Sequence, residues 1–470
     1  MNRDDLCFLP ATELAKLVRT KKLSPVEITQ AILARIERVN PWLNAFCTLT
    51  ADLALEQARK AEKAVMRKQA RLGPLHGVPF TVKDLLYTKG VRTMRGSKMY
   101  QHFVPQEDHP TVTRLLAAGG IMLGKTTTPE FGWKGVTDSP LSGITRNPWN
   151  LEKTPGGSSG GASAAVAAGL GPLAIGTDGG GSIRIPASFA GIVGHKPSFG
   201  RVPGYPPSPF YHLAHTGPMT RTVADAALML RVMAGPDDRD RLSLEAPPED
   251  YPALLKRGIK GKRVAWSPNL GFAKVDPEVA AVTARAARAF AQLGCKVEEV
   301  DPGFGDATEH FMTFWTSGIA GMLRDSMAQW EDQLDPGLVG QVKQGLTLSA
   351  ADYVQAQIWR HGYWDRVRAL FETHDLLLTP TVAVLPFKVG LVHPDEEKVK
   401  DQKNWIPWSP FTYPFNLTHL PACTVPAGFS KAGLPVGLQI VGRRFADTTV
   451  LQAAAAYEKV RPWAAKRPKL

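Results

Sequence analysis

Long apolar runs, paired cysteines and targeting segments are all scarce in this 470-residue chain. The longest stretch of low polarity, residues 162–175, is interrupted by a serine, two glycines and a proline and is too short to span a bilayer. Residues 1–5 lack the apolar core of a signal peptide. The four cysteines lie far apart without a pairing pattern, as is typical of proteins in a reducing compartment. We therefore expect a soluble cytoplasmic protein that does not bind membranes.

Metal-ligand spacings and a concentrated basic surface are also lacking. The 11 histidines form no His-Glu-x-x-His motif, so we expect no metal and no cofactor. The formal charge of +13 would suit a phosphate-binding protein, but the charges are dispersed along the chain. Only residues 461–469 form a basic cluster, which we interpret as a solvated terminus. No nucleic-acid partner is expected.

The N-terminal part has clear helical signals. Ser24 and Glu27 form a capping box around Pro25, which is favoured at the first helical position. Apolar residues then recur at helical spacing, and Pro41 is predicted to end this helix after Asn40. A second helix is predicted from Ala51 to about Ala70. N-terminal helices therefore occupy about residues 10–70.

Strands and helices alternate farther along the chain. Strands are predicted at residues 173–175, 264–266 and 297–300, and helices at 223–233 and 277–293. No repeat or low-complexity block interrupts this order. Alternation of this kind indicates an α/β fold in which helices wrap a large sheet, and the 44% apolar content is ample for its core.

Two serines embedded in glycine are the candidate nucleophiles. Ser158 lies in the Gly-Gly-Ser-Ser-Gly-Gly block of residues 156–161, and Ser182 follows 24 residues later in the Gly-Thr-Asp-Gly-Gly-Gly-Ser-Ile-Arg run of residues 176–184. Glycines allow backbone N–H groups to approach an oxyanion closely, because no Cβ atom stands in the way. A serine hydroxyl also needs a base within hydrogen-bond reach, directly or through a relay.

Lys83 is the best candidate for that base. The nearest histidine in sequence, His195, has the pattern of a buried or capping residue as much as that of a base. A lysine accepts a proton only when its amine is neutral, and burial can lower a lysine pKa by up to about 3 to 5 units. Lys83 ends an apolar strand in which it shares a face with Thr81. By this local pattern alone, an exposed lysine at a strand end stays an open alternative.

Together these segments resemble the amidase signature family, whose site reads Val-Lys-Asp, then Gly-Gly-Ser-Ser-Gly-Gly, then Gly-Thr-Asp-x-Gly-Gly-Ser-Ile-Arg. The resemblance extends along nearly the full chain, through segments such as residues 75–79, 145–150 and 433–440. It implies one compact domain over residues 1–470, with a mixed, many-stranded central sheet. A signature core would occupy about 75–235 and a substrate-shaping part about 236–470.

The resemblance also implies roles for individual residues. Ser182 would be the acylated nucleophile, Ser158 a relay in a cis peptide bond with Gly157, and Lys83 the base. The N–H groups of residues at the nucleophile's loop would form the oxyanion hole: Gly179, Gly180, Gly181 and Ser182. Three further residues would tie the two glycine loops together by hydrogen bonds: Ser159, Asp178 and Arg184. The segment Glu130–Gly132 would approach the substrate, so Gly132 joins the predicted site.

Two other motifs predict different functions and lack the required context. Residues 119–126 match a phosphate-binding loop, Gly-x-x-x-x-Gly-Lys-Thr, but a helix precedes them and Ile121–Leu123 reads as a strand, whereas such a loop needs a strand before and a helix after. Residues 157–161 match the Gly-x-Ser-x-Gly nucleophile elbow, yet polar residues ending in Pro155 precede them where a buried strand is required.

The function predicted from the sequence is amidase activity on a small-molecule amide, and two alternatives are kept. One is a glutaminase subunit of a tRNA-dependent amidotransferase. Such subunits usually read Gly-Gly-Ser-Ile-Arg-Gln-Pro, whereas this chain has Ile185 before Pro186. The other alternative is a catalytically silent binding protein on the same scaffold. Aromatic residues between Trp315 and Trp408 would suit either an aryl-amide pocket or ordinary core packing. A homodimer stays open.

Overall fold

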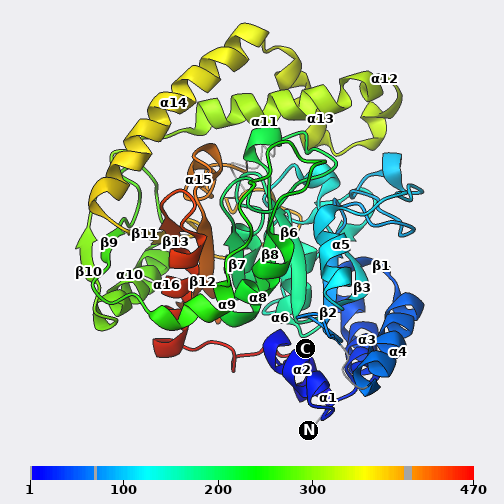
Figure 1. The fold of residues 1–470 in the computed structure, drawn as a ribbon. Helices are drawn as coiled ribbons and strands as arrows, with labels where there is room; N and C mark the ends of the chain where they lie inside the picture. Colours follow the sequence, from blue (N-terminus) through cyan, green and yellow to red (C-terminus); the bar gives the residue numbers. More distant parts are fainter. Residues whose placement is uncertain (1–2, 68–70, 396–404) are drawn as a thin grey trace.

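Eleven strands form one mixed sheet at the centre of the computed structural model, which describes residues 3–67, 71–395 and 405–470 (Figure 1). Their order across the sheet is β1-β3-β2-β6-β8-β7-β12-β13-β11-β9-β10. The strands are β1 (Phe46–Leu49), β2 (Pro79–Lys83), β3 (Ile121–Thr126), β6 (Leu173–Asp178), β7 (Val193–Lys196), β8 (His215–Thr220), β9 (Arg263–Trp266), β10 (Lys296–Glu299), β11 (Leu376–Pro380), β12 (Ala422–Phe429) and β13 (Pro435–Gly442). A separate hairpin pairs β4 (Asp138–Ser139) with β5 (Gly143–Ile144). The predicted α/β fold with a mixed, many-stranded sheet is confirmed.

Helices cover both faces of this sheet, as Figure 1 shows. They are α1 (Arg3–Cys7), α2 (Ala11–Arg19), α3 (Pro25–Leu43), α4 (Ala51–Met66), α5 (Pro110–Ala117), α6 (Gly160–Ala167), α7 (Arg184–Ala190), α8 (Val223–Met233), α9 (Tyr251–Leu254), α10 (Pro277–Gln292), α11 (Thr308–Leu323), α12 (Met327–Trp330), α13 (Pro336–Leu346), α14 (Ala350–Thr373), α15 (Pro414–Leu417) and α16 (Asp447–Val460). The predicted strand-helix-strand unit is β9, α10 and β10, whose two strands pair in parallel.

Alternation along the strands divides the interior into two cores. In β11, Leu376 and Leu378 join a core that includes residues of α3, α8, α10 and α16, whereas Leu377 points to an aromatic core with residues of α11, α13 and α14. The same alternation acts in β2, where Phe80 and Val82 enter the first core. Lys83 must therefore lie on the opposite face, away from that apolar core.

The first long helix does not end where its proline predicts. Helix α3 begins at the expected capping box, but it continues through Pro41 to Leu43. Proline lacks the N–H that would donate to the carbonyl four residues earlier, and near the end of the helix this removes one hydrogen bond without interrupting a long helix. Asn44 then closes the helix in a left-handed conformation, with φ 53° and its N–H donated to the Asn40 carbonyl. The second helix, α4, ends at Met66, short of the predicted end, and residues 68–70 lie outside the described part of the chain.

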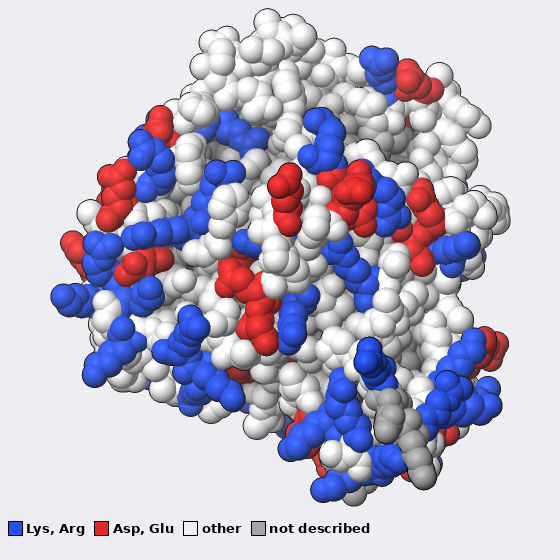
Figure 2. Space-filling view, in the orientation of Figure 1, with Lys and Arg blue, Asp and Glu red and all other residues white. Residues whose placement is uncertain are grey.

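The C-terminal tail is anchored on the molecule through Trp463, while its basic residues Arg461, Lys466, Arg467 and Lys469 are exposed, in line with the prediction of a solvated basic terminus. Trp463 is buried, and its Nε1 donates to the Arg221 carbonyl at 2.8 Å. Arg467 pairs with Asp5, so the basic tail packs beside the first helix. On the face shown in Figure 2, basic side chains are spread out with acidic ones between them. Among the described residues, no helix is long and apolar enough to cross a membrane.

Candidate active site

Three segments bring the predicted site residues together. Lys83 is the last residue of β2, and Thr177 and Asp178 end the neighbouring strand β6, which pairs with β2 in parallel. Carboxyl ends of parallel neighbours meet at one edge of a sheet, where open α/β sheets usually place their chemistry. The loop that carries Ser158 enters α6, and the loop that carries Ser182 enters α7.

Lys83 is fully buried among hydroxyl groups. Its Nζ lies 2.6 Å from Ser158 Oγ and 2.9 Å from Thr177 Oγ1. Burial lowers the pKa of Lys83 well below its ordinary value, and the charge of Asp178 opposes this shift only in part. Sequence pattern alone left an exposed lysine as an alternative, and the 0% exposure of Lys83 excludes it.

The two serine loops are joined through Ser159. The Gly157–Ser158 peptide bond is cis, as the resemblance implied. Ser159 donates its N–H to the Ser182 carbonyl at 3.1 Å, and its hydroxyl donates to the Thr177 carbonyl at 3.2 Å. The hydroxyl also accepts the Thr177 N–H at 3.3 Å. Ser159 therefore holds Ser158 and Ser182 in fixed positions relative to the end of β6.

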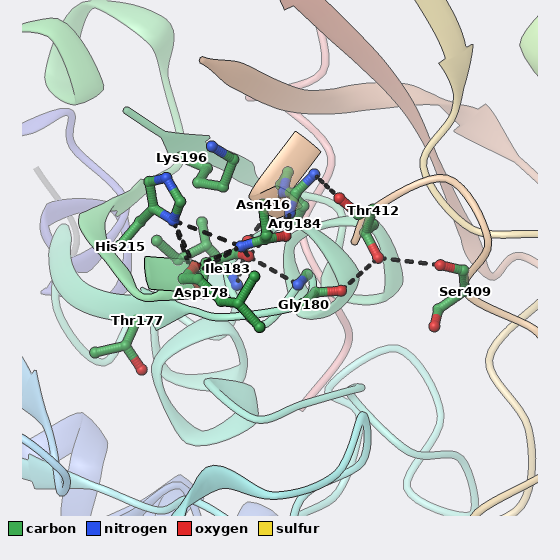
Figure 3. A network of polar contacts seen from close by, with 12 residues as sticks. Thr177, Asp178, Gly180, Ile183, Arg184, Lys196, His215, Ser409, Thr412 and Asn416 are labelled. Carbon is green, nitrogen blue, oxygen red and sulfur yellow. Dashed lines mark hydrogen bonds and ion pairs between the residues drawn. The ribbon is translucent and has the colours of Figure 1, made fainter. Parts of the chain in front are cut away.

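Asp178 is the centre of a buried polar network, drawn in Figure 3. Arg184 donates to both of its carboxylate oxygens at 2.9 Å, and both side chains are completely buried. Asn416 donates to the same carboxylate at 2.9 Å. Burial acts to raise the pKa of Asp178, yet the charge and hydrogen bonds of Arg184 hold it well below its ordinary value. The pair lies in the interior of the protein and not at its surface.

The loop that carries Ser182 is shaped by this network and by aromatic rings packed against it. Gly181 donates its N–H to Asp178 Oδ1 at 2.7 Å, so this group is already engaged and three of the four predicted cradle donors remain. The Gly180 carbonyl accepts the Thr412 hydroxyl at 2.6 Å. A Cβ atom on Gly180 would lie 2.8 Å from the Phe311 ring, and one on Gly179 would lie 3.1 Å from Trp315. Glycine is therefore required at these positions by packing behind the loop as well as by access in front of it.

Gly132 lies directly against Ser158. A Cβ atom there would stand 3.1 Å from Ser158 Oγ, and φ of 74° also favours glycine. Its N–H donates to the Pro129 carbonyl at 2.9 Å, so Gly132 shapes the wall without offering a free donor. Burial raises the pKa of the neighbouring Glu130 to about 7, and this side chain accepts the Asp335 N–H at 2.7 Å.

A cavity of about 430 Å³ opens onto both serines. Ser158, Ser182, Gly179 and Gly132 line it, together with apolar and aromatic side chains. Much of the remaining wall comes from residues 199–216, while the chain beyond residue 236 contributes Arg239–Leu242, Trp315 and Met322. Among the aromatic residues between Trp315 and Trp408, Trp315 reaches the cavity and Trp405 packs in the aromatic core.

The structure around the phosphate-loop and nucleophile-elbow motifs is not the structure that either function needs. In residues 119–126, Gly119 follows α5 and Lys125 lies inside strand β3, so no phosphate-binding loop forms. Irregular structure precedes Ser158, and no strand leads into a nucleophile elbow. His195 is buried in β7 against Asp447, 3.3 Å from its carboxylate. In the described part of the chain, no three His, Cys, Asp or Glu side chains lie close enough to hold a metal ion.

Sequence reasoning missed several residues of the site. Thr177 was seen only as part of a motif, and its contact with Lys83 depends on the parallel pairing of β2 and β6. Thr412 and Asn416 come from a segment more than 200 residues away and gave no sequence signal. Gln439, which accepts from Arg184 at 2.8 Å, lies in a segment that resembles the family, and this could have identified it.

Comparisons with known proteins identify the family. A sequence model of the Amidase family matches residues 27–451. An acylamidase of Rhodococcus erythropolis is 44% identical over 476 residues, which cover 100% of this chain and 98% of that protein. A glutamyl-tRNA(Gln) amidotransferase subunit of Moorella thermoacetica is 40% identical over 99% of both chains.

Solved structures show the same fold. A bacterial aryl acylamidase of the amidase signature enzymes superposes with a TM-score of 0.91 at 32% identity, covering 98% of this chain and 99% of that one. The 6-aminohexanoate cyclic dimer hydrolase superposes with a TM-score of 0.90 at 31% identity and the same coverage. Similarity of this extent in both sequence and fold establishes that the chain belongs to the amidase signature family of amide-hydrolysing enzymes.

Proposed function

We propose that this chain hydrolyses small-molecule carboxylic amides through an acyl-enzyme on Ser182, with Ser158 as proton relay and Lys83 as base. The observation that carries the proposal is the 2.6 Å contact between the fully buried Lys83 amine and Ser158 Oγ. A neutral amine at this distance can accept a proton from the relay hydroxyl, and burial favours the neutral form. Ser182 lines the same cavity, where a substrate carbonyl can reach it.

The reaction consists of two acyl transfers. Ser182 Oγ attacks the amide carbon while its proton passes through Ser158 to Lys83, and the carbonyl oxygen becomes an oxyanion facing the N–H groups of Gly179, Gly180 and Ser182. The carbon–nitrogen bond then breaks as the returned proton reaches the leaving nitrogen. Water, deprotonated by the same relay, attacks the ester carbon, and the carbon–oxygen bond to Ser182 breaks as the proton returns to Ser182 Oγ, which releases the carboxylate. Each oxyanion donor contributes about 2.7 to 4 kcal/mol in comparable sites.

Labelling with a serine-directed phosphonate tests the scheme. Mass spectrometry of the digested adduct should locate the phosphonate on Ser182. Labelling should fall sharply in Lys83→Ala, because the relay then has no base, while Ser182→Ala should abolish it. An adduct on another residue, or undiminished labelling of Lys83→Ala, would refute the assignment.

A glutaminase subunit is the second candidate, since full-length relatives of that class reach 40% identity. Ile185 replaces the glutamine that usually precedes the proline in that class, and this departure favours a free-standing amidase. The purified chain should therefore hydrolyse aryl and aliphatic amides by itself. Ammonia release from glutamine that appears only after a partner protein is added would favour the glutaminase role instead.

A further inference from the structure

Arg95 is a cation on the cavity wall that lacks an anionic partner. Among residues 3–67, 71–395 and 405–470, no acidic side chain forms an ion pair with it, and its buried Nε has no hydrogen-bond acceptor. Its guanidinium lies over the rings of Tyr87 and Tyr100, with centroid distances of 5.2 and 4.8 Å. The two rings hold a planar donor in a fixed orientation, and its hydrogen-bonding capacity is left for a ligand.

The backbone of Arg95 ties it to both sides of the proposed catalytic site. Its N–H donates to the carbonyl of Asp84, the residue after Lys83, at 3.1 Å. Its carbonyl accepts the N–H of Phe131, the residue before Gly132, at 2.8 Å. Arg95 has φ of 54°, an unusual conformation for a residue with a side chain. The guanidinium is thus presented from a backbone position fixed between the base and the wall beside Ser158.

The other charges that line the cavity leave its balance positive. Asp178 is neutralised by Arg184, whereas Asp240 keeps its negative charge and accepts the Gly204 N–H at 2.8 Å, so it offsets one of the cavity's cations. Arg239 is held by Asp237 through hydrogen bonds of 2.9 and 3.0 Å. Arg95 and the exposed Arg241 therefore remain as cations without a carboxylate within ion-pair distance in the described residues. The Nε of Arg95 is closed off by protein atoms, so a ligand in the cavity can be met only by the terminal Nη groups of this guanidinium.

We propose that Arg95 binds a carboxylate carried by the substrate, so that the preferred substrates are amides with an anionic group near the scissile bond. This inference rests on the proposed amidase function and specifies its substrate class. A planar guanidinium pairs with a carboxylate through two parallel hydrogen bonds, which are stronger than neutral ones and fix orientation. Arg95 then acts in specificity, and the chemical step is left to the serines and Lys83.

Matched acid and apolar substrates provide the test. Succinyl 4-nitroanilide carries a carboxylate on the acyl side, and its apolar isostere is 4-methylpentanoyl 4-nitroanilide. N-acetyl-4-aminobenzoate carries the carboxylate on the amine side, and its isostere is N-acetyl-4-isopropylaniline. The ratio of kcat/KM for acid over isostere is measured for wild type, Arg95→Met, Arg95→Lys and the control Arg92→Met, whose residue is exposed.

In at least one substrate pair, Arg95→Met should lower the acid-to-isostere ratio by about 10- to 100-fold, the range expected for a charge-assisted hydrogen-bonded pair. Arg95→Lys should fall between wild type and Arg95→Met, because it keeps the charge and loses the fork. Arg92→Met should leave the ratio unchanged. The pair that responds shows whether the carboxylate lies on the acyl or the amine side.

An acid-to-isostere ratio in Arg95→Met equal to that of wild type in both pairs would overturn the inference. If Arg95→Met is unstable, the wild-type enzyme decides by itself: succinate or 4-aminobenzoate should inhibit it competitively, and no inhibition by either overturns the inference. Failure of the proposed function looks different, because no anilide would then be hydrolysed and the phosphonate would not label Ser182.

Discussion

Two buried lysines lie near the ends of adjacent parallel strands and have different hydrogen-bond partners. Lys83 ends β2 and Lys125 lies near the end of β3, where it pairs with Val82. Both have 0% exposure. Lys125 donates to the Leu86 carbonyl and to the hydroxyls of Thr88 and Thr93, with a carboxylate of Asp84 4.0 Å away. In contrast, the hydrogen bonds of Lys83 go to hydroxyls alone.

This difference in partners decides what each amine can do. Burial lowers the pKa of Lys125 to about 8, with Asp84 limiting the shift, and burial lowers the pKa of Lys83 well below its ordinary value. The contacts of Lys125 fasten the loop after β2, which includes the cavity residues Leu85–Tyr87. Lys83 contacts a hydroxyl that faces the cavity. A buried lysine thus becomes a candidate base only where its neighbours can pass a proton to it.

Replacing Lys83 by methionine should impair activity, whereas replacing Lys125 by methionine should impair stability. Lys83→Met should lower kcat/KM by about 10²- to 10⁴-fold, the usual contribution of a positioned base, with no loss of stability because an unfavourably buried amine is removed. Lys125→Met should lower the free energy of unfolding by about 3 to 5 kcal/mol, because Asp84 is left buried and uncompensated. Activity assays and chemical denaturation of both variants measure these effects.

The double variant Asp84→Asn/Lys125→Met serves as the control, and it should recover much of the stability lost in Lys125→Met because no unpaired charge remains. A large loss of stability in Lys83→Met, or a Lys125→Met enzyme as inactive as Lys83→Met while still folded, would contradict the distinction between the two lysines.

The surroundings of Lys83 could be predicted from the sequence better than those of Lys125. The glycine-rich serine loops and the strand that ends in Lys83 were predictable, because they depend on local pattern and on family resemblance. Lys125 lies in a segment that matches a phosphate-loop motif. The neighbouring sequence argues against that motif, but it does not show which residues the Lys125 amine contacts. Its partners Thr88 and Thr93 come from a loop whose path depends on tertiary packing.

Long-range contacts account for most of what the sequence could not show. Thr412 reaches the Gly180 carbonyl, and Asn416 reaches Asp178, across more than 200 residues of chain. Periodicity and turn propensity carry no information about such pairs, since they describe neighbours along the chain. The hydrogen bond from the Gly181 N–H to Asp178 likewise cannot be predicted without the three-dimensional path of the loop.

The pH dependence of the free energy of unfolding should reveal the effect of burying Lys125. Each lysine has a folded-state pKa below its unfolded value, so the unfolded chain binds more protons between the two values and stability rises as pH increases through that window. For Lys125 the window runs from about 8 to the ordinary value of 10.5. Lys125→Met should therefore show a smaller rise in unfolding free energy between pH 8 and 10.5 than the wild type, as measured by denaturation at each pH. An equal rise would contradict the assigned burial effect.

The smallest expected effect comes from single hydroxyls beside each amine. Thr177 Oγ1 lies 2.9 Å from Lys83 and Thr93 Oγ1 lies 2.8 Å from Lys125, so Thr177→Val and Thr93→Val remove matched contacts. A neutral Lys83 must point its lone pair at Ser158, and Thr177 holds it there by accepting an N–H. Losing one such bond, worth about 0.5 to 1.5 kcal/mol, should lower kcat by about 2- to 12-fold in Thr177→Val with KM unchanged.

Thr93→Val should lower the free energy of unfolding by about 0.5 to 1.5 kcal/mol, the value of one hydrogen bond. Its kcat should stay unchanged, because Lys125 takes no part in the proposed proton path. Thr177→Ser should restore kcat, since it returns a hydroxyl to the same place. Equal kcat values in the two valine variants would mean that Thr177 supports structure only, and the contrast between the two lysines would then lie in Ser158 alone.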